Sequence, residues 1–177
     1  MKRPPFFFGW LVLLAIGYSL FIGAGMIFYA MSVLLETIVA ATGFSVAQIS
    51  AANTLFLVAA GFAGIAVGEL ISRYDVRYCV VLGTLVIAGA YVLLPRVSSL
   101  SDVYGVYMLL GIGYSMTALV PATTVVARWF VRRRALGLAL TQSGLSLGGV
   151  LLTPALAQML KTGGLETLQS GWVFWVI

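Results

Sequence analysis

The sequence predicts an all-α membrane protein with five complete transmembrane helices and the start of a sixth. The prediction depends on five uncharged runs, which cover residues 4–35, 37–68, 78–95, 103–127 and 135–160. A hydrocarbon core about 30 Å thick needs roughly 20 helical residues at about 1.5 Å each, so every run is long enough or nearly so. Runs this uniformly apolar exclude the alternating pattern of a membrane β-barrel, which leaves helices as the form that satisfies the backbone in lipid.

Composition excludes several other classes of protein. Hydrophobic residues make up 62% of the chain and charged residues 8%, whereas soluble proteins carry about 25% charged residues. The net charge is +5, but the charged residues lie in the tail and in the connections between apolar runs, so we expect no nucleic-acid partner. The chain has no histidine, and Cys79 is its one cysteine. We therefore expect no metal site, no cofactor and no disulfide framework, and no nucleophile–base constellation suggests an enzyme.

The basic residues alternate from one connection to the next. Eight of them fall on one predicted side of the membrane and two, Arg96 and Lys161, on the other. The eight are Lys2, Arg3, Arg73, Arg77, Arg128, Arg132, Arg133 and Arg134. By the positive-inside rule these residues face the cytoplasm, which predicts a cell-membrane protein with a cytoplasmic amino terminus.

Turn and capping signals divide the chain into a short cytoplasmic tail, residues 1–6, and one helical bundle, residues 7–177. The expected spans are Phe7–Leu35, a second from Ser45, Val76–Leu94, a fourth from just after Asp102 to Arg128, and Arg134–Leu160. Ser45 and Gln48 form a capping-box pattern ahead of the second span. A sixth span begins at Gly171 and reaches Ile177 after about a third of the length it needs. We interpret this sixth helix as truncated.

Small residues recur at helix-packing spacing in the second and fifth spans. They are Ala60, Gly61, Gly64, Gly68, Gly137, Gly144, Gly148 and Gly149. In lipid, close backbone approach at such faces holds helices together. These faces therefore predict tight packing, or surfaces that slide during transport. Pro121 and Pro154 each free a carbonyl within a helix, as is common where helices bend.

Polar side chains form stripes at 3.6-residue periodicity on three spans. The stripes are Tyr18, Ile22, Gly25, Tyr29 and Ser32; Tyr114, Thr117, Pro121 and Thr124; and Gln142, Ser146, Gly149 and Thr153. Such faces point either at other helices, through hydrogen bonds, or at a wet cavity. For the cavity, the candidate substrate-binding residues are Tyr18, Tyr29, Tyr114, Thr117 and Gln142. No charged residue lies deep in any span, so this part of the chain shows no ion-coupling group.

The segment from Gly68 to Arg77 resembles the G-x-L-x-D-R-x-G-x-R loop of major facilitator superfamily transporters. Gly68, Leu70, Arg73 and Arg77 match that pattern, while Ser72 and Asp75 replace its Asp and Gly. The loop also follows the second span on the predicted cytoplasmic side, as in that family. The resemblance implies the amino-terminal six-helix half of a twelve-helix fold.

Three further stretches resemble the monocarboxylate and oxalate–formate porter branch of that family. They are Gly9-Trp10, the segment Gly43–Ser50, and the segment Arg128–Gly149 with its Trp-Phe pair, basic residues and spaced glycines. The signature of drug–proton antiporters is not met, because Pro154 falls five residues beyond Gly149. Animal monocarboxylate porters carry a lysine low in the first helix, near where this chain has Tyr29.

The resemblance implies alternating access, in which two six-helix halves rock around a midplane site. Its cytoplasmic latch would consist of Gly68, Leu70, Ser72, Arg73, Asp75 and Arg77. The implied function is secondary transport of a small organic anion such as a mono- or dicarboxylate, with a coupled proton or an exchanged anion. The partners would then be the lipid bilayer and a carboxy-terminal six-helix half. The alternative is a truncated, non-transporting fragment or a regulatory half that pairs with a full-length relative.

Overall fold

The structure, a computed structural model, describes residues 8–130 and 133–163. The predicted tail and the predicted sixth span lie outside the described residues. Within the described ranges every regular element is helical, and five helices are long and apolar enough to cross a membrane. This confirms the predicted fold class.

Two of the five spans are interrupted near their middle by π-helical turns. The first consists of α1 (Gly9–Gly23), η1 (Ala24–Phe28, π) and α2 (Ala30–Thr42), and the second is α3 (Val46–Arg73). The third consists of α4 (Val76–Leu93) and the 3₁₀ turn η2 (Leu94–Arg96). The fourth consists of α5 (Leu100–Tyr114), η3 (Ser115–Leu119, π) and α6 (Val120–Trp129), and the fifth is α7 (Arg134–Gly163).

The helix ends follow capping chemistry, and they correct two predicted boundaries. The Ser45 hydroxyl accepts from the Gln48 N–H and the Gln48 side chain accepts from the Ser45 N–H, which confirms the predicted capping box. The fourth span begins earlier than predicted, because Ser99 and Asp102 form a second capping box and bring Asp102 into the first turn. The first span continues beyond the predicted end to Thr42, since the exposed Glu36 does not interrupt α2.

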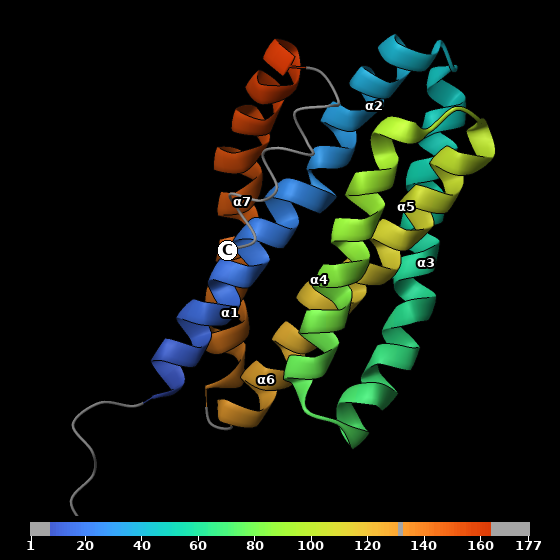
Figure 1. Cartoon of the computed structure of the whole chain (residues 1–177). Coiled ribbons are helices and arrows are strands. Elements are labelled where there is room, and N and C mark those ends of the chain that lie inside the picture. Colours follow the sequence, from blue (N-terminus) through green and yellow to red (C-terminus); the bar gives the residue numbers. More distant parts are fainter. Residues whose placement is uncertain (1–7, 131–132, 164–177) are drawn as a thin grey trace, which may run out of the picture.

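The spans form a bundle in which neighbours along the chain are not always neighbours in space. Figure 1 shows α1 and α2 running beside α7, while α3 runs beside α5 and α4 crosses in front. Helix α6 returns to the level of the start of α1. This end carries most of the arginines, and we call it the arginine-rich end. Its described arginines are Arg73, Arg77, Arg128, Arg133 and Arg134.

Glycines set the closest helix contacts. A methyl group on Gly148 of α7 would collide with the Phe21 carbonyl oxygen of α1, and one on Gly144 with the Gly17 carbonyl oxygen. Gly111 of α5 has the same relation to the backbone of α3. Such approach supplies contact where lipid offers no hydrophobic force. In contrast, a methyl group on Gly61 of α3 would meet nothing within 4 Å.

The two π-helical turns occupy equivalent places and lie close to one another. Each begins at the sixteenth residue of its span, at Ala24 and at Ser115. A methyl group on Gly23, just before η1, would lie 3.4 Å from the Cβ of Ala118 in η3. Spans one and four therefore approach each other where both helices widen.

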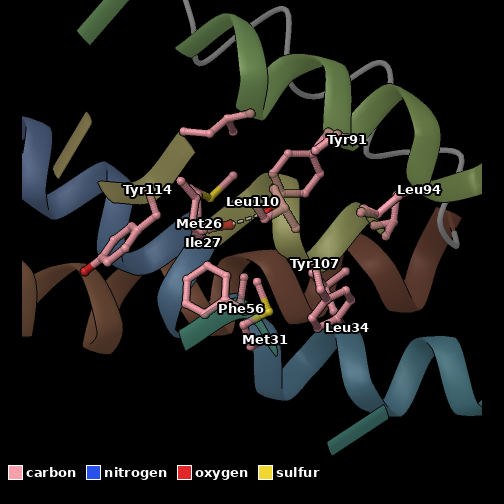
Figure 2. Packing of buried hydrophobic residues seen from close by; sticks show 14 of the residues in the cluster. Met26, Ile27, Met31, Leu34, Phe56, Tyr91, Leu94, Tyr107, Leu110 and Tyr114 are labelled. Atoms are coloured by element: carbon pink, nitrogen blue, oxygen red, sulfur yellow. Dashed lines mark hydrogen bonds between the residues drawn. The ribbon is translucent and has the colours of Figure 1, made fainter. Parts of the chain in front are cut away.

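A buried hydrogen bond connects the first π turn to the third span. The Tyr91 hydroxyl of α4 donates to the Met26 carbonyl of η1 at 2.6 Å. A π turn disturbs the regular i→i−4 ladder, which leaves its carbonyls open to a donor from another span. Figure 2 shows this contact inside the main apolar cluster, where Met26 and Ile27 lie among side chains of the third and fourth spans.

We predict that Tyr91→Phe lowers the free energy of unfolding by about 1 kcal/mol, because it leaves the buried Met26 carbonyl without its donor. The matched control is Tyr107→Phe. Tyr107 is also fully buried, but its hydroxyl has no partner among the described residues, so this variant should be neutral or slightly stabilising. Equilibrium unfolding in mixed micelles measures both, and equal effects would contradict the assignment.

We also predict that Gly148→Ala destabilises the bundle by about 1–3 kcal/mol, as overpacking does, because its methyl group meets backbone rather than a movable side chain. Gly61→Ala is the control, since its methyl group enters open space. Thermal unfolding of the two purified variants compares them. A Gly148→Ala variant as stable as wild type would show that α1 and α7 are not in close contact.

Candidate functional site

Regular helical periodicity places each predicted polar stripe on one face of its span. The π turns rotate the residues beyond them, so the stripe residues before and after a π turn no longer share a face. An α-helix turns about 100° per residue, so an extra residue in a turn rotates everything beyond it by that angle. Tyr18, before η1, is 63% exposed and stacks on Phe21 with ring centroids 6.4 Å apart. Tyr29, after η1, is half-buried with its ring against Gly149 of α7. The structure therefore does not bring these two tyrosines together.

Tyr29 and Tyr114 do come together, on either side of Phe28. The Phe28 ring lies 5.3 Å from that of Tyr29, edge-on, and 6.0 Å from that of Tyr114, stacked. Tyr114 also lies 5.7 Å from Phe56 of α3. We call these four residues the aromatic group. They sit beside the two π turns, close to the middle of the first and fourth spans.

The aromatic group presents two hydroxyls. Among the described residues, neither the Tyr29 nor the Tyr114 hydroxyl has a hydrogen-bond partner, and neither is fully enclosed. Figure 2 shows the Tyr114 hydroxyl pointing away from the packed side chains around it. Phe28 between them is 39% exposed. The group therefore offers an apolar face with two hydroxyl donors, and its four residues lie within the uncharged runs 4–35, 37–68 and 103–127.

Thr117 and Gln142 lie elsewhere. The Thr117 hydroxyl donates to the Gly113 carbonyl at 2.9 Å, and its methyl group packs against Gly83 of α4. Gln142 is exposed and lines a hollow of about 10 Å³ between α1, α6 and α7, nearer the arginine-rich end. That volume is about what a single water needs, so the hollow does not hold an organic ligand.

The described part of the chain holds no cluster of metal-ligating side chains. There, His, Cys, Asp and Glu form no group of three or more that could hold a metal ion. The chemistry available at the aromatic group is therefore hydrogen bonding by hydroxyls and contact with aromatic rings.

The loop that resembles the family motif lies at the arginine-rich end, between α3 and α4. Arg73 Nη2 lies 2.7 Å from Glu69 Oε1, one turn earlier in α3, and both side chains are exposed. The Ser72 hydroxyl donates to the Glu69 carbonyl within the same helix. Asp75 caps α4, because its carboxylate accepts from the Arg77 N–H at 2.9 Å. The capping role in this loop thus belongs to Asp75, not to Ser72.

The two remaining motif residues have different surroundings. Leu70 packs against a small apolar cluster formed by Val67, Ile71 and Cys79. Gly68 is exposed, and a methyl group there would meet nothing within 4 Å. Leu70 therefore anchors the loop to the bundle, while Gly68 leaves the surface of α3 flat beside it.

Arg128 also contacts this loop region. This contact was not predicted from the sequence, where Arg128 served only for the orientation and for the Trp-Phe pattern. Arg128 Nη2 donates to the Ile71 carbonyl in the last turn of α3, with a long separation of 3.4 Å. A cation at a helix C-terminus is stabilising. The sequence signal that could have predicted this contact was the position of Arg128 at the end of the fourth span, level with the end of the second.

Aromatic packing also closes the arginine-rich end. The Trp10 ring meets the Phe130 ring edge-on at 5.8 Å. A methyl group on Gly137 of α7 would lie 2.9 Å from Val126 and 3.2 Å from the Phe130 ring. One contact between the first, fourth and fifth spans therefore brings together Trp10, Phe130 and Gly137. These residues come from the Gly-Trp pair, the Trp-Phe pair and the spaced glycines, respectively.

The five apolar spans and the motif loop define a polytopic α-helical membrane protein. A sequence model of the Major Facilitator Superfamily matches residues 14–177. The chain belongs to this family.

Two curated relatives are similar to part of the chain. The uncharacterized MFS-type transporter YcxA of Bacillus subtilis (strain 168) is 34% identical over 109 residues, which is 60% of this chain and 26% of the relative. The aspyridones efflux protein apdF of Emericella nidulans is 34% identical over 118 residues, which is 65% of this chain and 23% of the relative. The matched part is thus about a quarter of the length of these relatives.

We predict that Arg128→Ala lowers the free energy of unfolding by roughly 0.5–1 kcal/mol, because it removes a charged donor between two spans. Arg73→Ala is the matched control, since an exposed pair within one helix contributes less than about 0.5 kcal/mol. Chemical unfolding of both variants at constant ionic strength provides the comparison. A larger loss from Arg73→Ala would reverse the assigned roles.

Proposed function

We propose that this chain forms part of a secondary transporter for a small organic anion, such as a mono- or dicarboxylate, that works by alternating access. The observation that carries the proposal is the aromatic group, with two tyrosine hydroxyls near the middle of the spans that have no hydrogen-bond partner among the described residues. Family membership supports transport, as do the names of the two relatives. One of those relatives is by its name an efflux protein, so export is a direction to test together with uptake.

The chemistry of the site favours an anion over other substrates. Tyrosine hydroxyls donate hydrogen bonds to a carboxylate, and an arginine or lysine of a second half would supply the countercharge. An organic cation would need an intramembrane carboxylate, and the described spans hold none near the aromatic group. A sugar site arrays several amide and acidic side chains. Here Gln142 lines the small hollow nearer the arginine-rich end, and Asn53, one turn before Phe56 in α3, is a single amide close to the aromatic group. The resemblance to the monocarboxylate and oxalate–formate porter branch agrees with this choice.

We further propose that the loop from Gly68 to Arg77 acts as the latch between two halves. Arg73 bonds only within its own helix in the described structure, and its side chain is 71% exposed. It is therefore accessible to an acidic group or a helix C-terminus of the second half. The Asp75 carboxylate is engaged in capping, so the arginines carry the latch. Coupling to a proton or to an exchanged anion would depend on groups of that second half.

For the site, we predict that Tyr29→Phe and Tyr114→Phe each weaken carboxylate binding up to about tenfold, the effect of losing one hydrogen bond to a charged group. Tyr18→Phe is the control, because Tyr18 is exposed and remote from the aromatic group. The assay is carboxylate uptake and exchange in liposomes by the protein that contains this chain and the second six-helix half. If carboxylates neither move nor compete while a sugar or an organic cation does, the substrate class is wrong.

For orientation, we predict that the arginine-rich end faces the cytoplasm, following the eight-to-two distribution of basic residues. The measurement is thiol labelling of Asp75→Cys in intact cells, with Ser98→Cys at the opposite end as control and Cys79→Ser as background. Cys79 is fully buried, so replacing it with serine changes the thiol labelling little. Labelling of position 75 from outside by an impermeant reagent would overturn the topology.

A further inference from the structure

A groove of about 620 Å³ lies between the end of α4 and the first part of α5, at the end of the bundle opposite the arginine-rich end. Its walls are mostly apolar, and Leu93, Met108 and Leu109 expose 44%, 44% and 37% of their surface there. None of its lining residues belongs to the aromatic group or to the motif loop. The proposed transport function therefore does not account for it.

The length of the groove matches one leaflet of a bilayer. Its lining on α5 extends from Asp102, in the first turn, to Ile112. Ten residues of α-helix rise about 15 Å, which is half of a hydrocarbon core about 30 Å thick. The groove thus covers the depth of one acyl chain, from the membrane surface to the midplane.

Two opposite charges stand at the mouth of the groove. Arg96 and Asp102 both line it, and both are exposed. They form no ion pair with each other, and in the described structure no other acidic side chain pairs with Arg96. Asp102 Oδ2 accepts from the Ser99 N–H at 2.9 Å as part of the capping box, while Oδ1 accepts no hydrogen bond within the described residues. A cation and an acceptor are therefore available on the two sides of the mouth.

We infer that this groove binds one phospholipid with a zwitterionic primary-amine head group, of the phosphatidylethanolamine type. The acyl chain lies along Met108, Leu109 and Ile112, the phosphate contacts the Arg96 guanidinium, and the ammonium donates to Asp102. A guanidinium suits phosphate oxygens, and an ammonium suits a carboxylate. A quaternary ammonium has no N–H to donate to Asp102, and a phosphatidylglycerol head group has no cation for it.

A glycine in the groove wall allows a direct test. Gly105 lines the groove, and a Cβ atom there would meet nothing within 4 Å. Gly105→Leu therefore fills the groove without disturbing the packed core. Gly89 of α4 is also exposed with open space beside it and does not line the groove. Gly89→Leu is a matched control for the glycine-to-leucine change itself.

The experiment uses the whole chain in nanodiscs of phosphatidylcholine that contain a phosphatidylethanolamine with a photoreactive group in its acyl chain. Mass spectrometry then maps the lipid adducts. We expect adducts on α5 between Gly105 and Ile112. Their yield should fall about tenfold in Arg96→Gln, as for loss of one charge-assisted contact, and at least as far in Gly105→Leu, whose side chain occupies the groove. Gly89→Leu should give the wild-type yield, and circular dichroism checks that all variants are folded.

Competition distinguishes head-group recognition from simple apolar contact. Unlabelled phosphatidylethanolamine should compete better than phosphatidylcholine or phosphatidylglycerol, and Asp102→Asn, which keeps an oxygen for the capping box, should remove that preference. Equal competition by all three lipids would overturn the inference, as would adducts unaffected by Gly105→Leu. Lipid adducts elsewhere on the chain but none on α5 between Gly105 and Ile112 would show that lipid does not occupy the groove, and would also overturn it.

Discussion

Hydrocarbon provides no hydrogen-bond partners, and the structure of this chain depends on that constraint. Every backbone N–H and C=O within the membrane must find a partner in the protein. Long uninterrupted helices satisfy most of them, and side-chain caps satisfy the first N–H groups of α3, α4 and α5. Where a π turn disturbs the helix, the Tyr91 hydroxyl reaches the Met26 carbonyl from a neighbouring span. A local irregularity thus becomes a contact between spans.

The same constraint explains which polar side chains are available for function. Threonine hydroxyls within the spans mostly bond a carbonyl one turn earlier in their own helix. This holds for Thr84, Thr117, Thr124 and Thr141. A tyrosine hydroxyl is too far from its own backbone for such a bond, so it must find a partner on another helix or remain available. Tyr91 belongs to the first case, and Tyr29 and Tyr114 to the second.

Helix pairing places those two tyrosines near one another. Glycines bring α7 against α1 and α5 against α3, and Gly23 brings the first and fourth spans together at their π turns. Phe28 then lies between Tyr29 and Tyr114. At the arginine-rich end, Trp10 and Phe130 meet, and Arg128 reaches the end of α3. The candidate site and the proposed latch are thus held by the same few spans.

Hydropathy, length and capping are local properties, so the fold class, the number of complete spans and the capping box at Ser45 could all be predicted from the sequence. The sequence also carried the family motif, which the match to the Major Facilitator Superfamily supports. Which residues of the polar stripes meet depends on how the spans pack against one another. Periodicity grouped Tyr18 with Tyr29, but η1 adds a residue to the turn between them and separates them. Such a turn depends on partners from distant spans, like the Tyr91 hydroxyl, and a local pattern does not contain that information.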